Sequence, residues 1–371
     1  MKIAFVISTF PPRIGGMGQV ALNQALGLVR LGHEITVFTL DYGVRLPESN
    51  LKIEYLSAKI RLGDAGFVPQ LLSKLRGFDL VHLHFPFYGA SFMVLLASMF
   101  YHVPYVATYH MDAQPKGIIK NIIKFFSDRL GGILVLKKAK KVILVDQSVE
   151  QFSLIKNVDV EKVVKINNAI DTEIFSKKIV SATELGLASI SNKKILLFVG
   201  NLMPIKRLDL VLEAMNKLTD PDFVLIVVGG GYEEGMYRTL TQDLSLQDQV
   251  YFVGQINNPQ TLSKYYSLAQ VTVVASDYES FSLVALESMA CATPVIGSRI
   301  SELQNKIEVG VNGLTFTQGS SDDLMKKIKE FFGYHLEQRQ AMGQQGRGGV
   351  INKFSLDKNL QDLVKVYESI I

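Results

Sequence analysis

Short apolar runs alternate with amphipathic helical patterns along the whole chain of 371 residues. Runs such as Phe223–Val228 and Val271–Ala275 would carry apolar side chains on both faces of an extended strand. Strands of that kind, alternating with helices, are typical of a parallel sheet that helices cover on both sides. The chain is therefore predicted to be an α/β protein built on doubly wound parallel sheets.

This alternation starts near the N-terminus and restarts at Lys194. In the first half we expect strands at Ile3–Ile7, Ile35–Leu40, Ile53–Tyr55, Leu80–Leu83, Tyr105–Thr108, Val142–Val145 and Val163–Ile166, and helices at Gly18–Leu31, Ser91–Phe100 and Ile118–Leu130. In the second half we expect strands at Lys194–Val199, Phe223–Val228, Val250–Val253, Val271–Ala275 and Pro294–Ile296, and helices at Leu208–Lys217, Glu233–Leu244, Leu262–Ala269 and Leu283–Ala290.

The restart predicts two Rossmann-like domains in tandem. We expect the first over residues 1–170, a linker without strand signal over 171–192, and the second over 193–352. A C-terminal helix over 353–371 is able to pack back on the first domain. Ligands of such sheets bind at the carboxyl ends of the strands, so the site is predicted in a cleft that the two domains face.

Charge is distributed unevenly between the two halves. Residues 1–170 hold 20 lysines and arginines against 12 acidic residues, whereas the remainder holds 19 against 23. This asymmetry indicates either two domains with different partners or a chance scatter of solvated charges. The single cysteine, Cys291, fits a reducing compartment. The N-terminal apolar run is shorter than a signal peptide needs, and no stretch reaches the ~18 apolar residues of a spanning helix. We therefore expect a cytoplasmic protein.

Two glutamates eight positions apart, Glu279 and Glu287, lie in a segment of low charge. From Phe281 to Ser298 the only charged residue is Glu287. Because a carboxylate is almost never fully buried without a partner, Glu287 either lies on an exposed helix face or meets a polar group. A ribose edge would be such a group, with phosphates at the start of the helix that Ser280 to Val284 begins.

Two further segments are able to bind an anion. Gly15, Gly16 and Gly18 lie between a strand and a helix, where free amides suit a phosphate, although a tight turn alone also needs glycine. Asp41 ends the next strand and suggests a nicotinamide dehydrogenase as an alternative, but the glycine spacing does not match G-x-G-x-x-G. Lys206 and Arg207 follow a strand and either reach phosphate oxygens or lie in solvent.

Together these segments resemble the retaining glycosyltransferases of family 4, which have the two-domain GT-B fold. The matching residues occur in the family's order across most of the chain: Gly15-Gly16-Met17-Gly18, Asp79-Leu80-Val81-His82-Leu83-His84, Thr108-Tyr109-His110-Met111-Asp112, Asn168-Ala169-Ile170-Asp171 with Phe175, Gly200 to Arg207, the two glutamates, Thr293-Pro294-Val295-Ile296, and Gly310-Val311-Asn312-Gly313-Leu314.

The resemblance implies a role for each site residue. Glu287 would hold the nucleotide ribose, Lys206 would neutralise the diphosphate, and Glu279 would meet the donor sugar and diphosphate. Gly16 would approach the diphosphate from the first domain, on the acceptor side, and His110 would lie near the sugar and the acceptor. The implied catalytic residues are His110, Lys206 and Glu279, and the implied binding residues are Gly15, Gly16, Gly18, Asn201, Arg207, Ser280, Phe281, Ser282, Leu283 and Glu287.

The resemblance also implies an activity. Such an enzyme, a hexosyltransferase of class EC 2.4, moves a sugar from a nucleotide-diphosphate sugar to a hydroxyl of a glycan or a lipid-linked acceptor, with retention. In the mechanism usually proposed for the family, the leaving phosphate accepts the acceptor's proton, so no dedicated nucleophile, cofactor or metal is expected. Asn201 replaces a usual arginine, and Ala169, Ser282 and Ala292 replace usual glycines. A catalytically inactive subunit that binds a sugar nucleotide therefore stays an alternative.

A basic amphipathic pattern occurs in the first half. Lys116, Lys120 and Lys124 recur every fourth residue among isoleucines and phenylalanines. Such a helix is able to lie on an anionic bilayer, which suggests peripheral contact with the inner membrane face. The alternative is a helix packed on its own sheet with its lysines in water. No nucleic-acid partner is expected.

Overall fold

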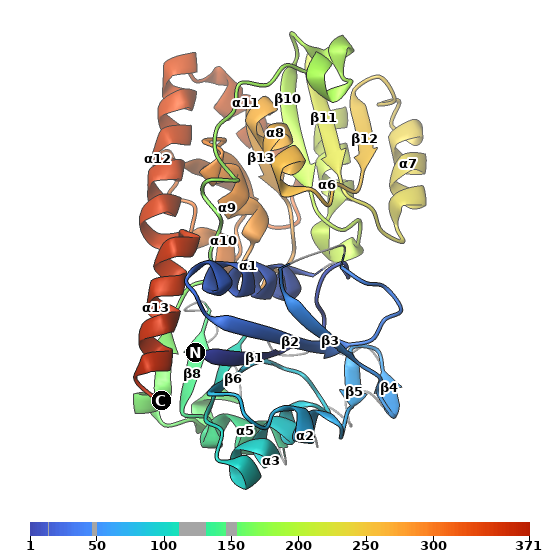
Figure 1. Cartoon of the computed structure of the whole chain (residues 1–371). Coiled ribbons are helices and arrows are strands. Elements are labelled where there is room, and N and C mark those ends of the chain that lie inside the picture. Colours follow the sequence, from blue (N-terminus) through green and yellow to red (C-terminus); the bar gives the residue numbers. More distant parts are fainter. Residues whose placement is uncertain (14, 47–49, 111–130, 146–153) are drawn as a thin grey trace. The chain divides into compact units, whose positions relative to one another are not determined.

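The computed structural model describes residues 1–13, 15–46, 50–110, 131–145 and 154–371 (Figure 1). The chain divides into two compact units. Unit 1 comprises Met1–Ala169 and Leu356–Ile371, and unit 2 comprises Ile170–Ser355. Each unit is built on its own parallel sheet, which confirms the predicted fold class of two Rossmann-like α/β domains.

Unit 1 contains a seven-stranded sheet in the order β3-β2-β1-β6-β7-β8-β9. Its strands are β1 (Lys2–Val6), β2 (Glu34–Leu40), β3 (Lys52–Leu56), β6 (Leu80–Phe85), β7 (Tyr105–Tyr109), β8 (Lys141–Leu144) and β9 (Val163–Lys165). Neighbouring strands are parallel. The strand order reverses between β1 and β6, which is where such sheets bind ligands.

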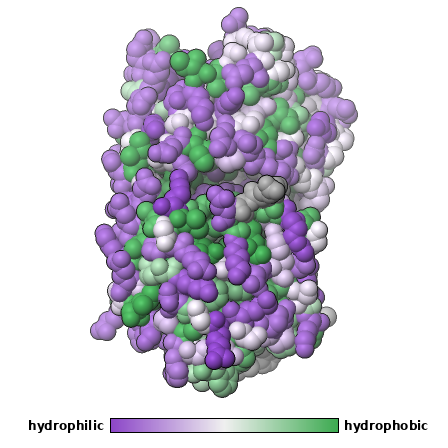
Figure 2. All heavy atoms as spheres, viewed as in Figure 1, coloured by the Kyte–Doolittle hydropathy of each residue, from purple (hydrophilic) through white to green (hydrophobic). Residues whose placement is uncertain are grey.

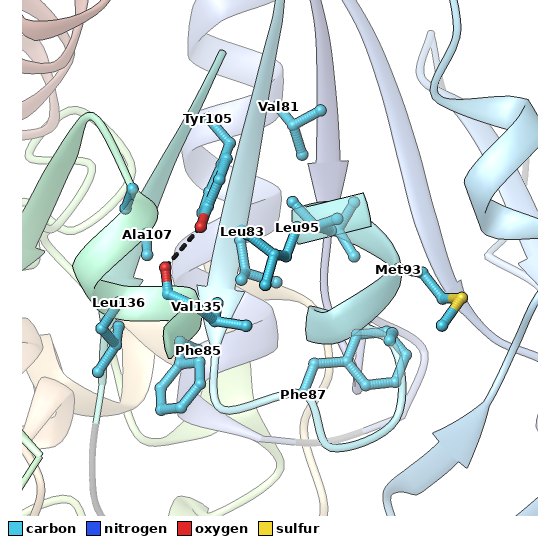
Figure 3. Packing of buried hydrophobic residues seen from close by; sticks show 14 of the residues in the cluster. Val81, Leu83, Phe85, Phe87, Met93, Leu95, Tyr105, Ala107, Val135 and Leu136 are labelled. Carbon is cyan, nitrogen blue, oxygen red and sulfur yellow. Dashed lines mark hydrogen bonds between the residues drawn. The ribbon is translucent and has the colours of Figure 1, made fainter. Parts of the chain in front are cut away.

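Helices cover both faces of this sheet. Those among the described residues are α1 (Gly16–Arg30), α2 (Leu71–Lys74), α3 (Ser91–Tyr101), α5 (Ile133–Lys138) and α13 (Leu356–Glu368). Ile3 and Phe5 of β1 pack with α1 and α13, whereas Ala4 and Val6 lie in the core under α2, α3 and α5. Figure 3 shows the core under α2, α3 and α5, in which Leu95 of α3 lies beside Leu83 of β6. A short antiparallel hairpin, β4 (Ile60–Leu62) and β5 (Ala65–Phe67), completes the unit.

Unit 2 has a six-stranded sheet in the order β12-β11-β10-β13-β14-β15. The strands are β10 (Lys194–Val199), β11 (Phe223–Val228), β12 (Val250–Gly254), β13 (Val271–Val274), β14 (Val295–Ser298) and β15 (Gly313–Phe316). The helices are α6 (Leu208–Asn216), α7 (Glu234–Asp243), α8 (Pro259–Leu268), α9 (Leu283–Ala290), α10 (Ser301–Gln304), α11 (Ser321–Gly333) and α12 (Leu336–Phe354). Side chains of β10 alternate between a core with α8, α9 and α12 and a core with α6, α7 and α11.

The expected linker is not a free connection. Phe175, Leu187 and Ile190 are buried in the core of unit 2, and the Lys178 ammonium donates to Ser263 Oγ at 2.8 Å. Residues 171–192 therefore belong to unit 2. Their apolar side chains follow neither a helical nor a strand period, so only packing brings them into the core.

The C-terminal segment contains two helices. We expected one helix over 353–371, whereas α12 ends at Phe354 and α13 begins at Leu356. Helices α11 and α12 and the strand β15 were not among the expected elements. Gly313–Phe316 pairs with β14 as an edge strand of only four residues, which gives too short a pattern to recognise.

Hydrophilic and hydrophobic side chains are interspersed over the face of the molecule in Figure 2. Within the described ranges, no helix combines the length and the apolar character that crossing a bilayer requires.

Candidate active site

The strand order of unit 2 brings two sequence-distant loops together. Strands β10 and β13 are neighbours at the point where the order reverses, so the loops after their carboxyl ends lie side by side. The backbone N–H of Asp277 donates to the carbonyl of Ile205 at 2.9 Å and ties these loops to each other. Lys206 lies on the first loop and Glu279 on the second.

Lys206 and Glu279 form an ion pair in this position. The Lys206 ammonium donates to Glu279 Oε1 at 2.8 Å, and Ser276 Oγ donates to the same oxygen at 2.7 Å. Glu279 is buried, while a quarter of the Lys206 side chain is exposed. The carboxylate is thus neutralised and fixed, and the ammonium, which donates one proton to Glu279, has two further N–H groups that are able to donate to an anion. An arrangement of this kind positions a cation rather than a nucleophile.

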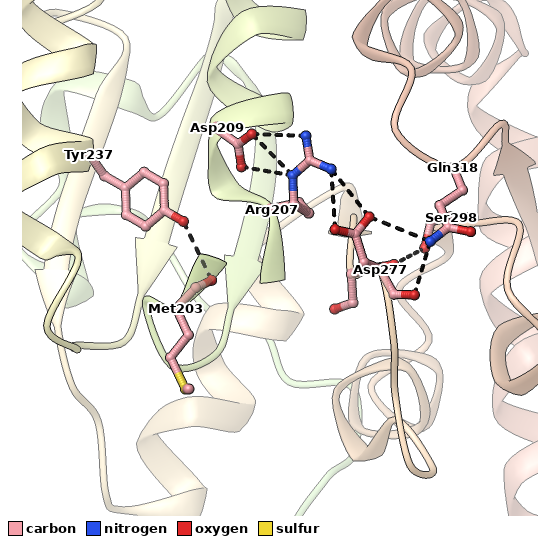
Figure 4. A network of polar contacts seen from close by, with 8 residues as sticks. Met203, Arg207, Asp209, Tyr237, Asp277, Ser298 and Gln318 are labelled. Atoms are coloured by element: carbon pink, nitrogen blue, oxygen red, sulfur yellow. Dashed lines mark hydrogen bonds and ion pairs between the residues drawn. The ribbon is translucent and has the colours of Figure 1, made fainter. Parts of the chain in front are cut away.

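Arg207 has a different environment from the one expected. Its guanidinium contacts Asp209, with Nη2 3.0 Å from Oδ2, and Nη1 donates to Asp277 at 3.2 Å (Figure 4). Gln318 also donates to the Asp277 carbonyl at 3.0 Å. Two carboxylates therefore already neutralise Arg207, which weakens its assignment as a phosphate ligand. The Asn201 amide side chain makes no hydrogen bond to another described residue.

Glycines allow the loops after β10 and β11 to touch. Gly229 has φ 145°, and a Cβ on it would lie 1.9 Å from the Gly200 carbonyl oxygen. Leu202 N donates to the Gly230 carbonyl at 2.9 Å and continues the contact. Only glycine fits where two backbones approach so closely. The contact fixes the start of the loop that carries Lys206.

Helix α9 begins next to Glu279 in sequence. Ser282 precedes it with φ 62°, and its buried Oγ has no hydrogen-bond partner in the described part of the chain. Phe281 is buried, and Leu283 is the first helical residue. The first amides of a helix lack intrahelical acceptors, and the positive end of its dipole attracts anions. With the orphaned hydroxyl, the start of α9 therefore suits an anionic ligand.

Glu287 lies in the second turn of α9 and is paired within unit 2. Tyr266 of α8 donates its hydroxyl to Glu287 Oε2 at 2.8 Å. Burial raises the pKa of Glu287 to about 7, and the hydrogen bond from Tyr266 opposes that rise. The side chain is partly buried, so the exposed-face alternative is wrong, and the alternative that a polar group meets the carboxylate is confirmed. A protein hydroxyl, not solvent, meets the carboxylate.

In unit 1, the glycine turn leads from β1 into α1. Gly15 precedes the helix and Gly16 is its first, exposed residue. A Cβ on Gly18 would lie 2.8 Å from the Thr9 carbonyl oxygen, so glycine is needed for the turn to pass the strand end. Gly16 thus carries a free helix N-terminal amide at the carboxyl end of β1.

His110 lies directly after β7, against a stack of buried imidazoles. Its Nε2 lies 3.0 Å from His84 Nδ1, and the two rings stack with centroids 5.3 Å apart. His82 stacks on His84 and contacts Tyr367 Oη and Thr108 Oγ1, each at 2.6 Å. Burial lowers the pKa of His110 to about 3. His110 is thus neutral near pH 7 and serves as a hydrogen-bonding group, not as a proton donor of the imidazolium type.

Within the residues that the structure describes, no group of three or more His, Cys, Asp or Glu side chains is placed to hold a metal ion. The expectation that no metal is essential stays a prediction. Asp41, which suggested a dehydrogenase, is bound through both oxygens by Arg45 at 2.7 and 2.9 Å. These hydrogen bonds lower the pKa of Asp41 to about 2.

Sequence comparisons place both units in one family. Residues 186–349 match the family described as Glycosyl transferases group 1, and residues 14–174 match Glycosyltransferase Family 4. The chain belongs to the group 1/family 4 glycosyltransferases. This glycosyltransferase is 29% identical to an uncharacterized glycosyltransferase of Methanocaldococcus jannaschii, with 99% of this chain and 98% of the relative covered.

Two further similarities are informative. The glycosyltransferase is 26% identical to the N-acetyl-alpha-D-glucosaminyl L-malate synthase of Bacillus anthracis, over 100% of this chain and 98% of that protein. Its structure is similar to that of Anabaena HepE in complex with UDP, with a TM-score of 0.82, 18% identity and complete coverage of both chains. At that identity the structural likeness establishes the GT-B fold alone.

The roles expected for the residues around the start of α9 stay predictions, and their hydrogen-bond partners were not expected. The structure brings Lys206, Glu279, Ser282 and the α9 amides into one region of unit 2, while Gly16 and His110 lie in unit 1. Ser276 and Tyr266 were missed. A serine three residues before a glutamate is a weak local signal that would have indicated Ser276, whereas nothing in the sequence marks Tyr266. Lys116, Lys120 and Lys124 lie outside the described residues.

Proposed function

We propose that this glycosyltransferase moves a sugar from a nucleotide-diphosphate sugar to a hydroxyl acceptor with retention of anomeric configuration. The observation that carries the proposal is the Lys206–Glu279 pair, which lies beside the first amides of α9 at the switch point of unit 2. Lys206 and these amides would stabilise the charge that develops on the departing diphosphate. A UDP complex of the similar Anabaena protein supports a nucleotide ligand.

In the proposed reaction, the bond between the anomeric carbon and the phosphate oxygen breaks as the acceptor oxygen bonds to that carbon. The acceptor's proton passes to the leaving phosphate on the same face. Glu279 does not attack in this scheme, because Lys206 and Ser276 already hold its carboxylate. Glu287 would accept hydrogen bonds from the ribose. For unit 1 we propose that the Gly16 amide meets the diphosphate and that His110 donates to or accepts from a sugar hydroxyl.

The test is a transfer assay with UDP-, GDP- and ADP-sugars and a panel of hydroxyl acceptors, with the product's anomeric configuration read by NMR. Lys206→Ala is expected to lower kcat about 10²- to 10³-fold. The matched control is Lys194→Ala, which breaks an ion pair with Asp220 at the start of β10. Nucleotide binding without turnover on any acceptor would instead support an inactive subunit, and tight NADH binding would support a dehydrogenase.

We also propose that the enzyme works in the cytoplasm, in peripheral contact with the inner membrane face, where a lipid-linked acceptor would be within reach. The single cysteine and the basic first half of the chain support this part of the proposal. It concerns only the place of the reaction, so the transfer assay with water-soluble acceptors is independent of it.

A further inference from the structure

Helix α3 has an apolar face that no described part of unit 1 covers. Its eleven residues, Ser91–Tyr101, include no charged side chain. Met93 and Leu95 point into the core (Figure 3), whereas Phe92, Met99 and Phe100 are 43%, 62% and 65% exposed. Positions seven and eight residues apart lie on one side of a helix, so these three side chains share a face. Single exposed apolar residues are common, but such a cluster indicates a contact surface.

The neighbouring helix adds cations. Helix α5 packs against α3, and its Leu134 is 41% exposed. Lys137 and Lys138 lie three and four residues further on, on the same face as Leu134, and Lys140 follows the helix. All three lysines are exposed, and none of them forms an ion pair with another residue that the structure describes.

The two chain segments that carry these helices contain no acidic residue. From Leu80 to His110 and from Gly131 to Val145 the chain has no aspartate or glutamate. Lys162 also reaches this region, because its ammonium donates to the Lys137 carbonyl at 2.7 Å, and its partner Asp159 lies 3.9 Å from the same ammonium. We call Phe92, Met99, Phe100, Leu134, Lys137, Lys138 and Lys140 together the α3–α5 face. Its α3 side is apolar, and its α5 side carries the lysines.

We propose that the α3–α5 face docks unit 1 on an anionic lipid bilayer. The apolar side chains of α3 would enter the boundary between headgroups and acyl chains, and the lysines would contact anionic headgroups. The inference rests on the peripheral contact in the proposed function and assigns it to a different segment from Lys116, Lys120 and Lys124.

Charge favours a bilayer over a second copy of this chain. A symmetric dimer through this face would place each surface against its own copy, and the unpaired lysines would repel one another. An anionic bilayer instead offers both an apolar layer and negative charge in one partner. Each lysine near such a surface strengthens binding about fivefold, so three lysines contribute about 100-fold.

The experiment is sedimentation of the full chain with vesicles of phosphatidylcholine alone or with about one-third phosphatidylglycerol, at 0.15 M salt. The triple substitution Lys137→Gln, Lys138→Gln and Lys140→Gln is expected to weaken binding to the anionic vesicles about 100-fold. Its matched control replaces three exposed lysines of unit 2 by glutamine, at Lys326, Lys329 and Lys353. That control loses the same charge and is expected to bind nearly as the parent does.

Phe100→Glu tests the apolar part, with Ile179→Glu as the control at a fully exposed isoleucine of unit 2. Only the first is expected to lower binding. The inference is overturned if the parent does not bind anionic vesicles, if the variants of the α3–α5 face bind as the parent does, or if glutamines at Lys116, Lys120 and Lys124 alone remove binding. Turnover of a water-soluble acceptor is measured on the same samples, so a failure of the proposed function is seen separately and misfolded variants are recognised.

Discussion

Replacing Glu287 by glutamine is expected to stabilise unit 2 at pH 8 and to weaken nucleotide binding at the same time. The pKa of this carboxyl is raised from an ordinary 4.5 to about 7 by burial. A raised carboxyl pKa means that ionisation is costlier in the folded state than in the unfolded state. The native protein therefore loses stability as pH rises from 4.5 to 7, because the folded state binds the proton more tightly.

The size of this loss follows from the shift. A difference of about 2.5 pKa units corresponds to roughly 3 kcal/mol above pH 7 and to less than about 1 kcal/mol at pH 5. Glutamine has no charge to desolvate and keeps an oxygen that accepts the Tyr266 hydroxyl. The variant is thus expected to unfold at a Tm roughly 6–12 °C higher than the parent at pH 8, with a much smaller gain at pH 5.

The same substitution is expected to remove much of the stabilisation by a nucleoside diphosphate. A ligand at 100 times its Kd stabilises the parent by about 2.7 kcal/mol. If glutamine weakens a charged hydrogen bond to the ribose by about 2 kcal/mol, less than about 1 kcal/mol of that stabilisation is left. The assay is calorimetric melting at pH 5 and pH 8, with and without ligand. A gain in Tm equal at both pH values, or no gain at pH 8, would refute the electrostatic reasoning, and an unchanged ligand shift would refute the ribose role.

Three further predictions concern unit 2. Gly229→Ala is expected to lower the free energy of unfolding, measured in urea, by roughly 3 kcal/mol or more, because the new Cβ would lie 1.9 Å from a backbone carbonyl oxygen. The control is Gly235→Ala, at a helix position with open space around it, which should raise the free energy of unfolding by up to about 1 kcal/mol. Tyr266→Phe removes the hydrogen bond that lowers the pKa of Glu287, so the carboxyl should take up its proton at a higher pH in the variant. Nucleotide affinity, which we expect to fall as Glu287 is protonated, should then start to fall at a higher pH than in the parent. An unchanged dependence of Kd on pH between 5.5 and 9 would contradict this. Ala292→Gly should stabilise by roughly 1 kcal/mol, since Ala292 has φ 53°, and an equal or lower Tm would argue against strain there.

Two departures from the family pattern lie at residues whose backbone is in the left-handed region. Ser282 and Ala292 replace glycines that are usual in the family, and the structure places them at φ 62° and 53°. A backbone in that region favours glycine, so the departures carry a cost in conformational energy. At Ser282 the substitution also supplies the buried hydroxyl at the start of α9 that has no hydrogen-bond partner among the described residues.

Periodicity alone determined the fold class. Strands such as β11, in which all six residues are buried, need apolar side chains on both faces, and that composition is visible without coordinates. The order of the family's segments was also enough to identify the enzyme class. The sequence did not show that residues 171–192 belong to unit 2, because Phe175 and Ile190 enter its core without a regular spacing.

Only the tertiary structure decided which groups pair with which. Lys206 and Glu279 are 73 residues apart and meet because β10 and β13 are neighbours at the switch point of the sheet. The same arrangement pairs Arg207 with Asp277, a partner that the sequence did not indicate. A local sequence pattern specifies whether a segment is a strand or a helix, but the partner of a charged side chain depends on the strand order, which is set by the packing of the whole unit.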